Sequence, residues 1–405
     1  MRTRLACWGT LLLVGLVVAG CKGFFTSGPT TPGTTGLVYV LNSAQGAGNV
    51  GSVSGYLASS STGVLSQLVN SPFGTGKLNT PTSMSADASG KFVYVSSAAG
   101  AGGGPGVAGF VISSNTSTLG QLASVGAVQP AQATPTAIAV DPSARAVYAV
   151  ETTSTGAAQV EAFTINTSTG VLTAQANSPY SLGVNGTPTS ATVALSGGFL
   201  FVGMGTPAMP DGSIFSVPIN SDGTLKIAAI VKAPPLAGVS AVAALAADPT
   251  VSFLYAVDGI QFVSFYTINS STGALTAVAK YTAGSAPVSV GTAVVNPTTT
   301  FVFTANQGSN NVSGFIVGSG GGLTALVNSP FSVPATAQTP VALAVDPSQA
   351  FLYVVCKVSN SVLSFVIVPN NIPVLVAPGS SNPSTGQAPT AVVAVQCPLG
   401  RGHCG

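Results

Sequence analysis

The chain has 405 residues, of which 46% are hydrophobic and only 5% are charged, and its formal net charge is +2 at pH 7. This composition excludes nucleic-acid binding through a basic stripe, because the cations that would contact phosphates are missing. Beyond residue 20 no apolar run approaches the ~18 residues of a membrane-spanning helix.

The first twenty residues are a predicted export signal. Arg2 and Arg4 supply a positive start, and an apolar core follows over 11–18. The segment then ends in Val-Ala-Gly-Cys at Cys21, which resembles the lipobox of bacterial lipoproteins. The small residues fit a peptidase site, and the thiol of Cys21 would receive a diacylglycerol. An ordinary secretory signal with an incidental cysteine is the alternative.

These features predict a lipid-anchored protein of a bacterial cell envelope, in contact with the membrane through its anchor. Residues 1–20 are the predicted signal peptide, and the Gly-, Thr- and Pro-rich residues 21–36 are a predicted flexible tether. Lys22 stands where many lipoproteins of the inner membrane carry aspartate, so the outer membrane is favoured, in a periplasmic or surface-facing position.

After the tether, a Thr-Pro-Thr or related step recurs before short apolar runs. It is found at Pro81, Pro135, Pro188, Pro287, Pro340 and Pro389. The spacings are 54, 53, 99, 53 and 49 residues, and the interval of 99 covers two repeats. Such a period is typical of repeat architectures.

The third repeat shows four predicted strands, A to D. They cover 135–140, 146–150, 159–166 and 171–176. Asp141-Pro142 after strand A favours a type I turn. Glycine before strand D, as at Gly170, supplies the positive φ of a tight hairpin.

Strand B occurs seven times, and the chain ends complement each other. The first strand B, at Leu37, has no strand A before it, and the last strand A, 389–395, has no strand B after it. The last strand should therefore complete the first blade and remove the open edges of the array. We predict an all-β, seven-bladed β-propeller of four-stranded blades over 37–396, monomeric, with a cysteine-containing tail over 397–405.

The pattern resembles a known family of seven-bladed, lactonase-like propellers that includes 6-phosphogluconolactonases. The resemblance rests on strand A ending in Asp-Pro, on Leu-Tyr-Val in strand B and on the Ser-Thr-Gly-x-Leu hairpin. Asn-Ser-Pro-Phe at 70–73 and 328–331 adds to it. It implies the fold and admits lactone hydrolysis. Relatives with activity are expected to use His, Arg and Glu, and this chain has one histidine, His403, in the tail, so their catalytic residues are not transferred.

The residues that end strand B should gather at one mouth of the ring, where the B–C and D–A loops lie. They are Asn42, Ser97, Glu151, Met204, Asp258, Asn306 and Cys356. Asp211, in a B–C loop, and Lys357 join them. Glu151 and Asp258 are candidate catalytic residues, and Asn42, Glu151, Asp211, Asp258, Asn306 and Lys357 are candidate ligand-binding residues. Carboxylates there could bind a divalent cation such as Ca²⁺ or act as a general base; solvated loop charges are the alternative.

The remaining acids and cysteines have structural explanations. Asp87, Asp141, Asp248 and Asp346 fall in A–B turns and are expected to shape them. Glu161 in strand C is either buried with a partner or outward-facing near a blade edge, and the outward position is expected, because an unpaired buried charge is costly. Cys397 and Cys404 are disulfide candidates in an oxidising compartment, which leaves Cys356 free.

The sequence therefore predicts a binding or scaffolding module with a neutral hydroxyl- and amide-rich face. A glycan, a peptide or an envelope protein would be its ligand. The alternative is a lactone hydrolase of the 6-phosphogluconolactonase-like type, with or without a metal ion.

Overall fold

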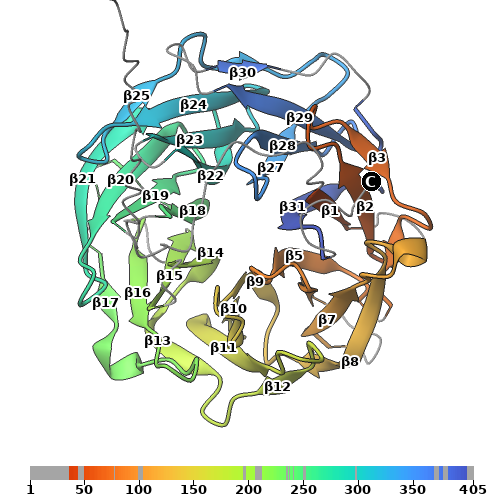
Figure 1. The fold of residues 1–405 in the computed structure, drawn as a ribbon. Helices are drawn as coiled ribbons and strands as arrows, with labels where there is room; N and C mark the ends of the chain where they lie inside the picture. Colours follow the sequence, from red (N-terminus) through yellow and green to blue (C-terminus); the bar gives the residue numbers. More distant parts are fainter. Residues whose placement is uncertain are drawn as a thin grey trace, which may run out of the picture.

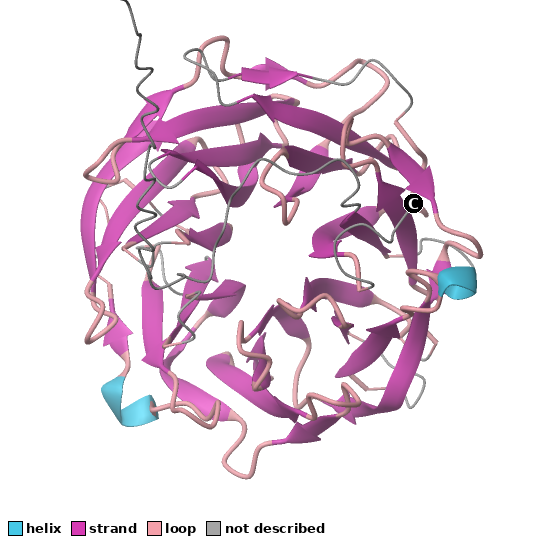
Figure 2. Ribbon diagram, viewed as in Figure 1, coloured by secondary structure: helices cyan, strands magenta, loops and turns pink. Residues whose placement is uncertain are grey.

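Seven antiparallel sheets surround a common centre in the computed structural model (Figure 1). The structure describes residues 36–43, 50–76, 78–98, 104–194, 198–205, 212–233, 236, 238–239, 241–249, 252–296, 299–368, 374–376 and 382–398. Helical structure in these ranges is limited to the 3₁₀ turns η1 (Thr116–Thr118) and η2 (Ile227–Ala229), as Figure 2 shows. The described part of the chain contains no helix long and apolar enough to cross a membrane. The predicted all-β, seven-bladed propeller is confirmed.

Each sheet is one blade, and its four main strands follow the order A to D from the centre outward (Figure 1). For blades one to seven, strand A is β31 (Pro389–Gln396), β5 (Pro81–Ala86), β9 (Pro135–Val140), β14 (Thr187–Val193), β18 (Ala244–Ala247), β22 (Pro287–Asn296) and β27 (Pro340–Val345). Strand B is β1 (Gly36–Asn42), β6 (Phe92–Ser97), β10 (Ala146–Thr152), β15 (Phe199–Gly205), β19 (Phe253–Val257), β23 (Thr299–Asn306) and β28 (Phe351–Cys356). Strand C is β2 (Ser52–Ala58), β7 (Gly106–Ile112), β11 (Ala157–Ile165), β16 (Ile214–Pro218), β20 (Phe262–Ile268), β24 (Asn311–Val317) and β29 (Ser361–Val368). Strand D is β3 (Leu65–Gln67), β8 (Leu122–Pro130), β12 (Leu172–Ala174), β17 (Val231–Lys232), β21 (Leu275–Thr282), β25 (Leu323–Ala325) and β30 (Val374–Val376).

The C-terminal strand closes the ring as predicted. β31 pairs antiparallel with β1, with Gly36 opposite Gln396 and Asn42 opposite Pro389. Blade one is therefore built from both ends of the propeller, so a hydrogen-bonded strand pair within this blade closes the ring.

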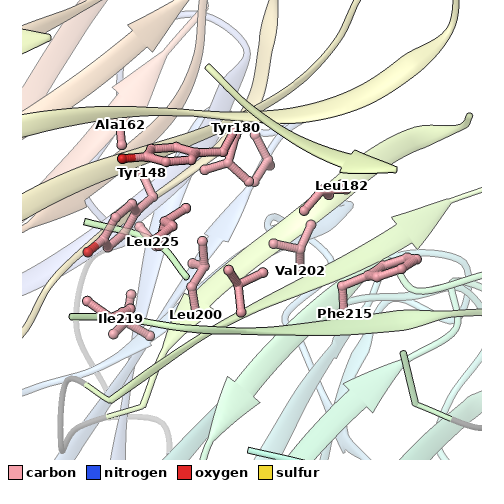
Figure 3. Close-up of a cluster of buried hydrophobic side chains, with 14 of the residues drawn as sticks. Tyr148, Ala162, Tyr180, Leu182, Leu200, Val202, Phe215, Ile219 and Leu225 are labelled. Carbon is pink, nitrogen blue, oxygen red and sulfur yellow. The ribbon is translucent and has the colours of Figure 1, made fainter. Parts of the chain in front are cut away.

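The core lies in the seams between blades rather than at the centre. Strand B is apolar on both faces because each face packs against a neighbouring blade. Figure 3 shows one such seam, where Tyr148 of blade three lies beside Leu200 and Val202 of blade four. All three side chains are fully buried.

The repeated tyrosine of strand B is hydrogen-bonded to the repeated turn glycine of the next blade. The hydroxyl of Tyr39 donates to the carbonyl of Gly120 (2.6 Å), Tyr94 to Gly170 (3.2 Å), Tyr148 to Gly223 (2.7 Å) and Tyr255 to Gly321 (3.1 Å). These four glycines have positive φ, which other residues rarely adopt. The repeated tyrosine and the repeated glycine are thus donor and acceptor of one hydrogen bond between neighbouring blades.

Replacing Tyr39 with phenylalanine should lower the free energy of unfolding by about 1–2 kcal/mol, because the buried carbonyl of Gly120 loses its donor. Tyr353 is the matched control, since its buried hydroxyl has no partner within the described ranges. The Tyr353→Phe variant should be as stable as the parent or more stable. Urea denaturation measures both, and equal losses in the two variants would contradict this role of the hydroxyl.

The repeated proline marks a fixed place in each blade. In six blades it lies opposite the last or last-but-one residue of strand B, as the pairs Pro389–Asn42, Pro81–Ser97, Pro135–Glu151, Pro188–Met204, Pro287–Asn306 and Pro340–Cys356. The next threonine then reaches the neighbouring blade: the hydroxyl of Thr82 donates to the carbonyl of Pro135 at 2.7 Å. The alignment of strand-B ends from the sequence is confirmed in these blades.

The Asn-Ser-Pro-Phe or -Tyr elements divide strand D, which the sequence did not predict. The serine hydroxyls of Ser71, Ser178 and Ser329 accept the backbone N–H of Gly55, Ala162 and Gly314 in strand C. Beyond them, β4 (Phe73–Gly74), β13 (Tyr180–Asn185) and β26 (Phe331–Ser332) pair with the same strand C.

Candidate functional site

The described residues that end strand B lie on the B–C and D–A side of the ring and are buried. Asn42, Glu151, Asp258 and Asn306 have exposed fractions of 1%, 0%, 3% and 0%. Glu151 and Asp258 are therefore not solvated loop charges. Lys357 is half-buried at the end of blade seven, and its backbone N–H donates to the carbonyl of Thr339 at 2.8 Å. Asp211 lies outside the described residues.

In blades one and six the strand-B end is a neutral hydrogen-bonding cluster. The amide nitrogen of Asn42 donates to the hydroxyl of Ser54 at 3.0 Å. The amide nitrogen of Asn306 donates to Asn311 at 2.8 Å and to Ser313 at 2.9 Å. These asparagines hold strand C to strand B, so their amide donors are already used.

Blade three carries two carboxylates in the same place. Glu151 lies opposite Gln159, and Glu161 lies opposite Ala149, so both carboxylates project from one face of the β10–β11 pair. Glu161 occupies the position of Ser54 and Ser313, and it is 5% exposed. The expectation that Glu161 faces outward is wrong, because this face of blade three packs on blade two.

The D–A loop of residues 131–134 covers this carboxylate pair. The N–H of Ala133 donates to Oε2 of Glu151 at 3.1 Å, and the N–H of Gln132 donates to Oε2 of Glu161 at 3.0 Å. The side chain of Gln159 donates to Oε1 of Glu151 at 2.5 Å. Neutral donors thus stabilise both carboxylates, and Gln132 itself is exposed.

The seam holds these two acids without a counter-ion from the blade that faces them. Residues 92–140, which form most of blade two, the covering loop and β9, contain no charged residue. Burial, followed by the charge of Glu151, raises the pKa of Glu161 to about 7. Burial also raises the pKa of Glu151, against the hydrogen bonds from Gln159 and Ala133. The carboxyl of Glu161 can therefore gain or lose its proton near neutral pH.

Asp258 mainly shapes its own turn. Its Oδ1 accepts the backbone N–H of Ile260, Gln261 and Phe262 at 2.8–2.9 Å, while Oδ2 is buried without a hydrogen-bond partner. It lies in blade five, two blades from Glu151. In the ranges that the structure describes, no group of three His, Cys, Asp or Glu side chains is placed to hold a metal ion. The joint cation site of Glu151, Asp211 and Asp258 stays a prediction.

The opposite side of the ring carries the structural acids. Asp87 and Asp346 are buried in A–B turns, and Oδ1 of each accepts the N–H of the first residue of strand B, at 2.6 and 2.9 Å. Arg145 pairs with Asp141 at 2.6 Å and donates to the carbonyl of Asn220 in blade four. Turn formation explains these residues, as predicted.

Two of the cysteines, Cys356 and Cys397, lie in the described part of the chain. Cys356 is a free thiol in the core, and burial raises its pKa to about 12, so it is not a nucleophile. Cys397 is disulfide-bonded. Cys404 and His403 lie outside the described residues, as do Cys21 and the rest of 1–35.

The carboxylate pair is therefore the one described feature of this mouth with acid–base capacity near neutral pH. The sequence indicated Glu151, and it missed Glu161. Glu161 aligns in strand C with Ser54, Ser264 and Ser313, which lie opposite strand B in other blades. This alignment with polar residues is the sequence feature that could have indicated its burial.

The comparisons with known proteins agree with this fold. Residues 92–288 match the family described as "Lactonase, 7-bladed beta-propeller", and no curated protein matches the chain. Among solved structures, the chain is similar to a candidate 6-phosphogluconolactonase from Bacteroides uniformis, with 15% identity, a TM-score of 0.68, and coverage of 89% of this chain and 100% of the other. A periplasmic gluconolactonase from Pseudomonas aeruginosa has 16% identity, a TM-score of 0.65, and coverage of 89% and 99%. At these identities the structural likeness shows the fold alone.

Proposed function

Because the chain resembles the seven-bladed lactonase propellers and matches them over residues 92–288, we propose that it hydrolyses a lactone at the B–C and D–A mouth. The observation that carries this proposal is the buried Glu151–Glu161 pair, in which the pKa of Glu161 is about 7. A general base works best when its pKa is close to the working pH.

In the proposed reaction Glu161, as carboxylate, takes a proton from a water molecule that attacks the lactone carbonyl carbon. The ring C–O bond then breaks, and the proton returns to the leaving oxygen, which gives a hydroxy acid. Glu151 tunes the base, since its charge is one cause of the raised pKa of Glu161. Access to Glu161 requires the exposed loop at Gln132 to move aside.

The substrate class that fits this seam is an uncharged sugar lactone. A phosphorylated lactone would need Arg or Lys at its phosphate, and residues 92–140 supply neither. An uncharged lactone needs no such cation.

The Glu161→Gln variant should hydrolyse glucono-δ-lactone at least about 100-fold more slowly than the parent chain, because it lacks the general base. The measurement is enzymatic acid release, corrected for spontaneous hydrolysis, and the 6-phosphate of the same lactone is the second substrate. Asp222→Asn is the control, since Asp222 is an exposed acid in a C–D turn. Full activity of the Glu161→Gln variant would refute the proposed role.

A binding module is the second candidate. The full burial of Glu151 and the two hydrogen bonds that its carboxylate accepts favour it, because a structural clamp needs no access to substrate. Its ligand would be a glycan, a peptide or an envelope protein. Calorimetric binding of a neutral oligosaccharide without lactone turnover by the parent chain would favour this function over hydrolysis.

We also propose that Cys21 carries a lipid that anchors the chain in the cell envelope, with the outer membrane favoured. The support is the lipobox-like Val-Ala-Gly-Cys and Lys22 after it. The Cys21→Ser variant should lose incorporation of a labelled fatty acid and leave the membrane fraction, because it lacks the acylated thiol. A variant that stays membrane-bound and labelled would contradict the anchor.

A further inference from the structure

The strand pair β1–β31 shows on which side of the ring the N-terminal segment joins it. Gly36, the first described residue, lies opposite Gln396. Gly90, in the A–B turn of blade two, lies against the same end of β31: a Cβ on it would be 2.6 Å from the carbonyl oxygen of Gln396. The N-terminal segment therefore joins the ring on the A–B and C–D side.

The candidate site is at the other end of the same strands. Asn42, at the far end of β1 from Gly36, occupies in blade one the position of Glu151 in blade three, because each faces the repeated proline of its blade. A strand of seven residues spans roughly 23 Å. The mouth and the attachment point are thus separated by the full height of a blade.

The segment between the proposed anchor and the ring is short. Gly36 lies 15 residues after Cys21, a distance of at most ~54 Å along an extended chain and of ~22 Å on average for the predicted flexible tether. To bring the mouth onto the membrane, the segment would have to pass two outer strands, ~10 Å, and then the ~23 Å height of the blade. That path is longer than the average end-to-end distance of the predicted tether.

The charges of the A–B and C–D side favour the same arrangement. Lys91 and Lys226 are exposed there, whereas the aspartates of the A–B turns are buried inside those turns. Asp222 is the exposed acid of this side. Two exposed cations and one exposed anion should give this side a weak attraction to anionic lipid headgroups. The attraction of one Lys or Arg side chain near such a surface is about 1 kcal/mol.

We propose that the anchored propeller faces the membrane with its A–B and C–D side and holds the B–C and D–A mouth away from it. This inference rests on the proposed lipid anchor and is independent of hydrolysis. The ligand of the mouth is then a molecule of the aqueous space or of a facing layer, and a lipid of the anchoring leaflet cannot reach it.

The test uses two exposed serines of blade three as labelling sites. Ser168 lies in the C–D turn and Ser154 in the B–C turn, at opposite ends of β11. Ser168→Cys and Ser154→Cys are each labelled with a donor dye in the full, lipidated chain. The chains are placed in phosphatidylethanolamine–phosphatidylglycerol vesicles that contain a headgroup-labelled acceptor. Cys356 is buried and Cys397 is disulfide-bonded, so the parent chain measures background labelling.

Energy transfer from the label at 168 should be several-fold greater than from the label at 154, and Cys21→Ser should remove transfer from both. Equal transfer, or greater transfer from 154, in a membrane-bound chain would overturn the orientation while leaving the anchor in place. A parent chain that does not bind vesicles would overturn the anchor and the orientation together. Neither outcome depends on lactone turnover.

Discussion

A chain that ends at Ala388 is expected to lose its cooperative unfolding transition. This truncation removes β31, so every residue of β1 loses its partner on the inner side. Val392 and Val395, both buried, leave the seams of blade one, at about 1.5–3 kcal/mol each. The open edge adds a further liability. Because domains of this kind are stable by only about 5–15 kcal/mol, the loss should unfold the ring, as measured by circular dichroism during heating.

A chain that ends at Gln396 is the matched control. It keeps the whole of β31 and lacks only Cys397 and the tail, so it should retain a single transition close to that of the full chain. Val392→Asp is a second variant, which keeps the length and places a charge in the seam between blades one and seven. If the chain ending at Ala388 melts like the control, closure by β31 is not what holds the ring.

The architecture was predictable because its determinants recur in the sequence. One hydrogen bond between neighbouring blades requires both a tyrosine and a turn glycine, so both residues recur in the repeats. The tyrosines are Tyr39, Tyr94, Tyr148 and Tyr255. The repeated proline then fixes where strand B ends. Seven copies make such marks visible even where one repeat departs from the pattern, as blade five does without its proline.

The candidate site was only partly predictable because it is a departure from the repeat. The alignment placed Glu151 opposite the repeated proline, as the strand register shows. The surroundings of Glu161 depend on blade two, which lies outside its own repeat. An isolated glutamate in a strand reads as an exposed residue, since burial of an unpaired charge is costly. Here the free-energy cost of burying the carboxylates is reduced by the backbone N–H groups of Gln132 and Ala133. Backbone donors of this kind cannot be predicted from a pattern of residue types.

Raising the pH from acid to neutral is expected to destabilise the parent chain, and Glu161→Gln should remove most of this effect. The pKa of Glu161 rises from 4.5 to about 7 on folding, so the folded state binds the proton more tightly. The resulting stability is fully present below the unfolded pKa and is lost as the pH rises through about 7. At about 1.36 kcal/mol per pKa unit, the loss is about 3 kcal/mol at most. The raised pKa of Glu151 acts in the same direction.

Urea denaturation at a series of pH values measures this dependence, with Asp222→Asn as the control acid outside the seam. Above neutral pH the Glu161→Gln variant should be more stable than the parent, because it buries no second charge beside Glu151. A parent chain whose stability rises between acid and neutral pH, or a variant with the parent's slope, would contradict the raised pKa of Glu161. The ionisation of Glu161 that weakens the fold is also the one that would create the general base. Hydrolysis should therefore increase as the pH rises through about 7, the pH at which the loss of stability is completed.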